Sequence, residues 1–109
     1  MNAWDIFDFD WPWGSHPAVI ISNPMRVRLK PQVVVLSCRT LQSGYKREPE
    51  ANEAILNSED GLNWETLCKC DVVYAAPKIE LVQRRGTVTP ERRRAIAERV
   101  IRALGLAGL

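Results

Sequence analysis

Two short stretches carry most of the fold information in this sequence, HPAVIIS at residues 16–22 and VVVLSCRT at residues 33–40. Each contains a run of aliphatic side chains rich in β-branched residues, and such runs favour strands. Because the apolar residues are consecutive rather than alternating, both faces of these strands are expected to be covered. A small closed β-barrel with a helix packed on it covers strands in this way.

The residues around these two runs predict further strands. Alternating aromatic and acidic residues at 3–9 indicate a first strand, and Trp11-Pro12-Trp13-Gly14-Ser15 indicates a tight connection to the second. Residues 53–56, 64–74 and 79–84 are further strand candidates, with a turn at residues 58–61 and a polar surface loop at residues 42–51. The 109-residue chain is therefore expected to form a single, mainly β domain over residues 1–109.

The last part of the chain predicts an amphipathic helix. Thr89 suits the N-cap, and Pro90 suits the first helical position, where no backbone N–H is needed. Four apolar side chains then recur at helical spacing: Ile96, Val100, Ile101 and Leu104. Gly105 is expected to end the helix. The predicted fold class is mainly β (β+α) with a C-terminal α-helix.

Charge does not settle the function by itself, because the net charge is only +2. Its distribution is uneven, since the C-terminal part holds seven arginines: Arg84, Arg85, Arg92, Arg93, Arg94, Arg99 and Arg102. These side chains predict either a basic surface for phosphate or an acidic peptide, or a merely solvated helix face. Asp5, Asp8 and Asp10 are interpreted as edge-strand acids that discourage aggregation rather than as a metal site.

The three cysteines, Cys38, Cys68 and Cys70, favour reduced thiols in a cytoplasmic protein, since their number is odd and no secretory signal precedes them. The Cys-Lys-Cys pair has no second pair to complete a zinc site, so neither a metal nor another cofactor is expected. On a strand, Cys68 and Cys70 would share one face and pack there. No apolar run is long enough to span a membrane, so no membrane association is expected.

The order of several motifs resembles the MazF/PemK-like type II toxins of the MazF/Kid/CcdB superfamily. Residues 16–22 are similar to the family's Arg-Pro-Ala-Val-Val-Ile-Ser strand, and residues 33–40 to its valine-rich third strand. Cys70-Asp71 matches a Cys-Asp pair that precedes the family's active-site segment. Residues 86–91 are similar to the family's Gly-x-Leu-Ser-Pro-Glu ending.

The resemblance implies an SH3-like small β-barrel, a homodimer, and a toxin neutralised by a cognate antitoxin with an acidic tail. It also implies metal-independent cleavage of single-stranded RNA (mRNA), in which the ribose 2′-hydroxyl attacks the adjacent phosphate. The chain departs from the family where His16 and Tyr74 replace arginines and where the loop between the first two strands is short. The alternatives are a catalytically degenerate toxin-like binding protein and a CcdB-like gyrase inhibitor, although residues 106–109 lack the terminal tryptophan motif of the latter.

Three residues are the candidate catalytic set. His16 stands at the position of a family arginine and could act as general base or acid near neutral pH. Arg39 could hold phosphate through its planar donors. Tyr74 could stack on a base or donate a hydrogen bond to phosphate. Each residue also has a purely structural interpretation, as a turn histidine, a surface arginine and a core tyrosine.

Five further residues are candidates for RNA binding: Ser37, Thr40, Lys69, Asp71 and Trp13. The hydroxyls could donate to phosphate or satisfy turns, and Lys69 would supply a cation on the same strand face as Asp71. Asp71 could orient a basic partner or make a structural hydrogen bond. Trp4 and Trp64 are expected in the core, whereas Trp11 and Trp13 are expected in an exposed loop, where they could bind a base or the antitoxin.

Overall fold

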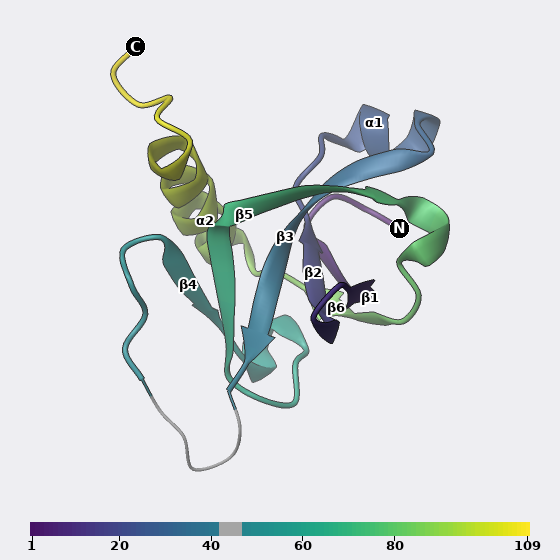
Figure 1. Ribbon diagram of the computed structural model, residues 1–109, viewed down its shortest axis with the longest axis horizontal. Helices are drawn as coiled ribbons and strands as arrows, with labels where there is room; N and C mark the ends of the chain where they lie inside the picture. Colours follow the sequence, from purple (N-terminus) through teal and green to yellow (C-terminus); the bar gives the residue numbers. More distant parts are fainter. Residues whose placement is uncertain (42–46) are drawn as a thin grey trace.

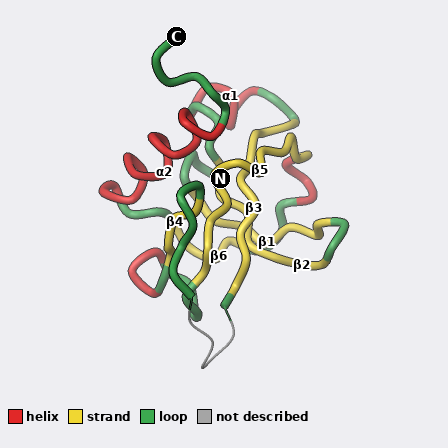
Figure 2. The backbone as a smooth tube through the Cα atoms, turned by 60° about the vertical axis from the view of Figure 1, so that its left-hand side comes forward, coloured by secondary structure: helices red, strands yellow, loops and turns green. Residues whose placement is uncertain are grey.

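The computed structural model describes residues 1–41 and 47–109, so part of the polar loop expected at residues 42–51 lies outside the described residues. One antiparallel sheet runs in the order β4-β5-β3-β2-β1-β6. It curls strongly, and the long helix α2 lies against it (Figures 1 and 2). The strands are β1 (Asp5–Trp11), β2 (Gly14–Ile20), β3 (Gln32–Thr40), β4 (Glu53–Leu56), β5 (Thr66–Pro77) and β6 (Arg84–Thr87).

The continuous aliphatic runs are covered on both faces, as their pattern predicts. Val19 and Leu36 belong to one buried cluster, which α2 (Pro90–Ala103) closes through Ile96. Their neighbours Ile20 and Val35 belong to a second cluster on the opposite face. Successive side chains of a strand point to opposite faces, so a strand buried on both sides needs an unbroken apolar run. The mainly β fold with a C-terminal helix is therefore confirmed.

A two-residue turn joins β1 to β2. Trp11 pairs with Gly14, which leaves only Pro12 and Trp13 between the strands. Gly14 has φ +126°, in the region that glycine occupies most readily. This hairpin confirms the tight connection and extends β2 four residues upstream of the apolar run, so that His16 lies within the strand.

Helix α1 (Pro24–Leu29) was not anticipated, because Ser22-Asn23-Pro24 was interpreted only as the end of a strand. Asn23 is the N-cap, and its side-chain oxygen accepts a hydrogen bond from the Arg26 N–H at 2.9 Å. Pro24 occupies the first helical position, where it needs no donor. Val27 is buried and fixes the short helix against β3.

The strand expected around residues 79–84, ending near Gly86, is present but begins later than predicted, because β6 covers Arg84–Thr87. Residues Lys78–Glu80 form the 3-10 turn η2, and regular pairing with β1 begins only at Arg84. The turn is held where the Lys78 N–H donates to the Pro31 carbonyl at 2.8 Å and its ammonium donates to the Val27 carbonyl at 2.7 Å. Ile79 is 91% exposed, so this apolar side chain lies on the surface and is not part of a buried strand.

Helix α2 begins at Pro90, and Gly105 follows its end with φ +72°, as expected. The Thr89 side chain makes no capping bond, however; instead its N–H donates to the buried Asp60 carboxylate at 3.0 Å. Only part of the predicted apolar stripe is covered. Ile101 and Leu104 are exposed because the end of the helix extends beyond the sheet (Figure 1). No helix in the described part of the chain is long and apolar enough to cross a membrane.

The structure also corrects the predicted burial of two tryptophans and the predicted edge position of the first strand. Trp64 is exposed rather than in the core, and Trp11 is 2% exposed rather than in an open loop. Strand β1 is not an edge strand, because β2 and β6 flank it. Two of its acids form ion pairs, Asp5 with Arg84 at 3.4 Å and Asp8 with Arg85 at 3.3 Å.

Candidate functional site

A pocket of about 290 Å³ opens where β2, β3 and β5 run side by side. Its lining residues are Trp13, His16, Ser37, Cys38, Arg39, Lys69 and Val72. The hairpin brings Trp13 and His16, the end of β3 brings three consecutive residues, and β5 brings two. Five of the eight residues selected from the sequence therefore meet in one place: Trp13, His16, Ser37, Arg39 and Lys69.

An irregularity in the β3–β5 ladder creates this pocket. Leu36 pairs with Val73 and Cys38 pairs with Cys68, so four residues of β5 lie opposite Ser37 alone. Extra residues on one strand bend it and interrupt the alternation of side chains. Strand β5 turns sharply at this level (Figure 1), and Lys69 and Val72 reach the same pocket although a regular strand would place them on opposite faces.

The same irregularity explains why Asp71 does not share the pocket with Lys69. The sequence predicts a shared face for these two residues, yet Lys69 lines the pocket and Asp71 does not. Asp71 is exposed on the bulged segment. Cys38 and Val72 were missed as lining residues, because no local pattern reveals a bulge that depends on pairing between distant strands.

The two pocket cations have different surroundings. Lys69 donates to Glu53 at 3.1 Å, and the same carboxylate receives two bonds from Arg47, at 2.7 and 2.9 Å. The Arg47 guanidinium, together with the Glu50 N–H and Lys69, lowers the pKa of Glu53 to about 2 against the opposing effect of burial. Arg39 is exposed, and no carboxylate of the described residues lies within ion-pair distance of it. Arg39 is thus the cation most available to an incoming anion.

His16 lies over the hairpin turn. A side chain at Gly14 would place its first carbon 3.6 Å from the His16 Nε2, an ordinary van der Waals contact, so the positive φ rather than crowding by the imidazole favours glycine here. The indole N–H of Trp11 donates to the His16 carbonyl at 3.3 Å and holds the backbone of β2 at this point. His16 is partly exposed and faces the pocket that Arg39 and Lys69 also line.

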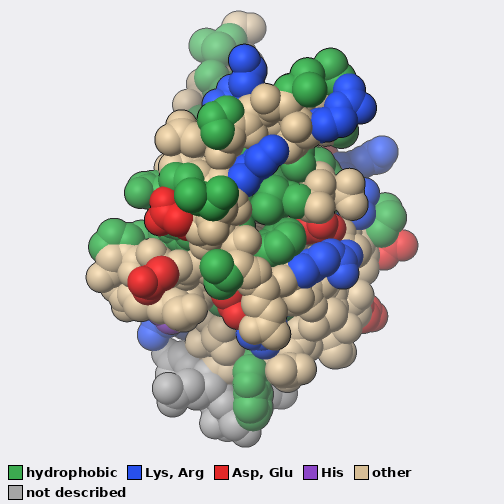
Figure 3. Space-filling view, turned by 90° about the vertical axis from the view of Figure 1, so that its right-hand side faces the viewer, with side chains coloured by type: hydrophobic (Ala, Val, Ile, Leu, Met, Phe, Trp, Pro, Cys, Tyr) green, Lys and Arg blue, Asp and Glu red, His purple; other side chains and the backbone are tan. Residues whose placement is uncertain are grey.

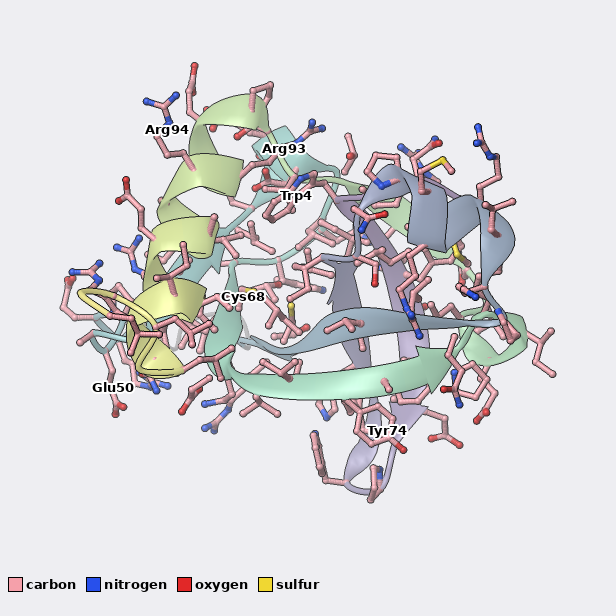
Figure 4. All side chains as sticks on the ribbon, turned by 90° about the horizontal axis from the view of Figure 1, so that it is seen from above. Trp4, Glu50, Cys68, Tyr74, Arg93 and Arg94 are labelled. Carbon is pink, nitrogen blue, oxygen red and sulfur yellow. The ribbon has the colours of Figure 1, made fainter. Side chains whose placement is uncertain are left out.

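An aromatic cluster adjoins the pocket. Trp13 is 58% exposed and stacks on buried Trp11, with ring centroids 5.3 Å apart and planes 12° apart. Tyr74 contacts the same cluster, 5.5 Å from Trp11 and 5.7 Å from Phe9, and its ring projects to the outside of β5 (Figure 4). Tyr74 lies beside the pocket and does not line it, and Thr40, paired with Thr66, is also outside the lining.

The three cysteines are buried together under α2. Cys38 and Cys68 are cross-strand partners, and Cys70 packs in the same cluster. The hydrogen bond between Cys68 and Cys38, together with burial, raises the pKa of the Cys68 thiol, and the hydrogen bond with Cys68 and burial raise the pKa of Cys70. The packing of Cys68 and Cys70 on one face is confirmed. No group of His, Cys, Asp and Glu within residues 1–41 and 47–109 has the arrangement of a metal site.

Most of the C-terminal arginines have partners within the chain. Arg92 bonds to buried Asp60 at 2.7 Å and to Glu59 at 3.1 Å, and Arg99 donates to the Ala95 carbonyl at 3.1 Å. Arg84 and Arg85 also form ion pairs, with the acids Asp5 and Asp8 of β1. Fewer arginines of this segment are therefore available to an external anion than the composition indicates. Arg94 and Arg102 remain exposed.

The curled antiparallel sheet with a C-terminal helix matches the fold of solved MazF-like toxins. The chain matches an endoribonuclease in complex with its cognate antitoxin from a mycobacterial species, with a TM-score of 0.84, 25% identity and coverage of 100% and 99% of the two chains. A second mycobacterial endoribonuclease matches with a TM-score of 0.82, 24% identity and coverage of 100% and 95%. A chain of the MazE-MazF complex from Deinococcus radiodurans matches with a TM-score of 0.73, 11% identity and 98% coverage of both chains.

These similarities extend over the whole chain, which confirms the resemblance to MazF-like toxins drawn from the sequence motifs. Neither a protein-family model nor a curated protein matches the sequence. The similarity to MazF-like toxins is therefore detected by comparison of structures, at low sequence identity.

Proposed function

We propose that this protein is the toxin of a type II toxin–antitoxin pair and acts as a metal-independent endoribonuclease on single-stranded RNA. The observation that carries the proposal is the convergence of His16, Arg39 and Lys69 on one open pocket beside the exposed face of Trp13. The similar mycobacterial proteins named endoribonucleases support the reaction class.

The pocket contains groups suited to transesterification of RNA. In that reaction a bond forms between the ribose 2′-oxygen and phosphorus, and the bond from phosphorus to the 5′-oxygen breaks. One group must accept the proton of the 2′-hydroxyl, and another must protonate the departing 5′-oxygen. His16 is the lining side chain suited to proton transfer at neutral pH, and it fills one of these two roles.

The cations stabilise the charge that develops on the phosphate. Arg39 can present two parallel N–H donors to phosphate oxygens, which a lysine cannot do. Lys69 adds a second positive charge, moderated by Glu53. We assign Ser37 and Thr40 to hydrogen bonds with the RNA phosphate, Tyr74 to base stacking or proton donation from beside the pocket, and Asp71 to orienting a basic group.

Selectivity for single strands follows from Trp13. Its ring is fixed on Trp11, and an aromatic face open to solvent can stack only on a base that is not already stacked within a duplex. We assign the protein to the cytoplasm, where mRNA is available, and place a cognate antitoxin with an acidic tail opposite its basic surface. The exposed apolar side chains Ile101, Leu104 and Leu106 at the end of α2 support a homodimer contact.

The decisive experiment is cleavage of a mixed-sequence single-stranded RNA by the purified protein in excess EDTA. His16→Ala, Arg39→Ala and wild type are compared, with binding of an uncleavable 2′-deoxy analogue measured in parallel. We expect cleavage by wild type, loss of cleavage with retained binding for His16→Ala, and loss of cleavage with weakened binding for Arg39→Ala. Cleavage that survives His16→Ala would remove histidine from the mechanism.

A binding-only protein is the second candidate, favoured by one observation: no carboxylate is among the described residues that line the pocket, so the second proton-transfer role falls to Tyr74, which lies outside the lining. RNA binding by well-folded wild type without cleavage would identify this case. Inhibition of DNA supercoiling by gyrase, without RNA binding, would identify the CcdB-like alternative.

A further inference from the structure

A buried carboxylate adjoins the pocket that contains His16 without lining it. Glu53 is the first residue of β4, and it is 2% exposed. Its cross-strand partner on β5 is Lys69, which lines the pocket. Side chains of residues directly opposite in an antiparallel pair lie close together on one face, and opposite charges attract there. Glu53 can therefore influence the pocket through Lys69, without touching a ligand itself.

Hydrogen bonds hold both oxygens of this carboxylate. Oε1 accepts from the Arg47 guanidinium at 2.7 Å and from the Glu50 N–H at 2.9 Å. Oε2 accepts from Arg47 at 2.9 Å and from the Lys69 ammonium at 3.1 Å. A lysine has a flexible four-carbon stem and loses much rotamer freedom when its ammonium is fixed. The carboxylate of Glu53, held from the segment that precedes β4, is therefore a fixed anchor for the ammonium.

Lys69 stands where β5 leaves its regular ladder with β3. The register of these two strands passes over residues 69–72, which include the pocket wall. Strand β4 holds this part of β5 from the other side, since Glu53 is the partner of Lys69 and the Cys70 N–H donates to the Asn52 carbonyl at 2.8 Å. The position of the Lys69 ammonium thus depends on β4 more than on β3.

The charges of this cluster do not cancel. Arg47 and Lys69 each carry one positive charge and Glu53 carries one negative charge, so the three together carry one positive charge. The Arg47 guanidinium is the main reason that the pKa of Glu53 is lowered to about 2, and the carboxylate is charged at neutral pH. Without Arg47, the ion pair of Lys69 and Glu53 would be neutral and would attract a phosphate only weakly.

We propose that Glu53 and Arg47 position Lys69 for contact with the RNA phosphate in the pocket, Glu53 by holding the ammonium and Arg47 by offsetting the charge of Glu53. Glu53 is thus a positioning residue, because it acts on RNA through Lys69. The inference rests on the proposed function, since it adds two residues behind the pocket to the same reaction.

The first test separates cleavage from binding. We measure kcat with saturating mixed-sequence single-stranded RNA, and affinity with its uncleavable 2′-deoxy analogue. Glu53→Gln removes a negative charge, so its affinity should equal or exceed that of wild type. Its kcat should fall about tenfold, because the ammonium is no longer held in place. Stoichiometric titration with the analogue measures the folded, active fraction, so that partial unfolding is not mistaken for a lower kcat.

The second test asks whether Glu53 acts through Lys69. In a Lys69→Met background the ammonium is absent, so Glu53→Gln should change kcat by less than about twofold. Equal losses in the two backgrounds would overturn the proposal, because Glu53 would then act independently of Lys69. Weaker binding by Glu53→Gln than by wild type would overturn it as well.

The third test concerns the charge of Arg47. Lys and Arg side chains occur at several separate places on the face that Figure 3 shows, so a general loss of positive charge needs a control. Arg47→Met should weaken binding of the analogue about fivefold at low salt, and Arg94→Met, at an exposed position of α2, less than about twofold. Equal binding by Arg47→Met and Arg94→Met would overturn the proposal. Arg47 is partly exposed, so this variant carries the test if Glu53→Gln does not fold.

These measurements distinguish failure of the inference from failure of the proposed function. If wild type cleaves RNA and both Glu53→Gln and Arg47→Met match it, the inference fails and the proposed function stands. If wild type binds the analogue without cleaving RNA, the proposed reaction fails, and the comparison of Arg47→Met with Arg94→Met decides the inference. If wild type binds no RNA, both fail.

Discussion

Trp13 stacks on Trp11 with ring centroids 5.3 Å apart, yet one ring is 58% exposed and the other is 2% exposed. The buried indole supports the hairpin, and the exposed one faces the pocket that contains His16 and Arg39. A rigid backing ring lowers the entropy that the outer ring loses when a base stacks on it. We therefore expect Trp11 to contribute mainly to the stability of the fold and Trp13 mainly to RNA binding.

Trp13→Ala is predicted to weaken binding of single-stranded RNA by about 1–3 kcal/mol while leaving the free energy of unfolding nearly unchanged. Trp11→Ala is predicted to lower the free energy of unfolding by about 3–5 kcal/mol, because it empties a buried site. Anisotropy with an RNA oligonucleotide and urea unfolding measure the two effects. A loss of stability in Trp13→Ala equal to that in Trp11→Ala would show that the outer ring is structural.

Arg39→Ala is predicted to reduce RNA affinity and to flatten its salt dependence, with the slope of log K against log salt falling by about 0.7 for one lost phosphate contact. Arg94→Ala, an exposed arginine on α2 away from the pocket, is the matched control and should leave the slope unchanged. Titrations at several salt concentrations provide the measurement. Identical slopes in wild type and Arg39→Ala would exclude a phosphate contact at this residue.

The Glu53 carboxylate is predicted to make the fold sensitive to acid. Its pKa is lowered from 4.5 to about 2 in the folded chain, so its stabilisation is complete above about pH 4.5 and disappears as the pH falls through 2. The contribution at neutral pH is on the order of 3 kcal/mol. Urea unfolding of wild type and Glu53→Gln between pH 7 and pH 2 should show the difference shrinking toward low pH. Glu50→Gln, at an exposed position nearby, should behave like wild type throughout.

Asp60→Ala is predicted to lower the free energy of unfolding by about 3–5 kcal/mol, because Arg92 and two backbone N–H groups would lose a buried partner. The carboxylate accepts from the Asn57 and Thr89 N–H groups and from Arg92, and thereby joins η1 (Ser58–Asp60) to the start of α2. Glu59→Ala removes the exposed partner of the same arginine and should cost no more than about 1 kcal/mol. Chemical denaturation of the two variants gives the comparison, and equal losses would contradict the role of Asp60.

Cys38, Cys68 and Cys70 are predicted to be nearly unreactive in the folded protein. All three are buried, and the raised pKa of Cys68 and Cys70 keeps those thiols protonated at neutral pH. Titration with a chromogenic disulfide reagent should label the thiols slowly in buffer and rapidly in denaturant. Fast native labelling would mean that the sheet opens locally beneath the pocket.

The sequence by itself determined the strands with unbroken aliphatic runs, the start and end of α2, and the tight hairpin, because side-chain periodicity, Pro90, Gly105 and Pro12 act over a few residues. It also supplied His16, Arg39, Lys69 and Trp13 as candidates, because their chemistry is visible without a fold. Helix α1 was missed although Asn23-Pro24 has the pattern of a cap and first turn.

Only the tertiary structure decided which candidates meet. The four residues of β5 opposite Ser37 place Lys69 and Val72 in one pocket and leave Asp71 outside it, and this bulge arises from pairing between strands some thirty residues apart. The ion-pair partners of the arginines could not be predicted from the sequence either, since Asp60 and Arg92 become neighbours only when the turn that contains Asp60 packs on α2. Local residue preferences fix the elements, whereas long-range pairing and burial fix which side chains share a site.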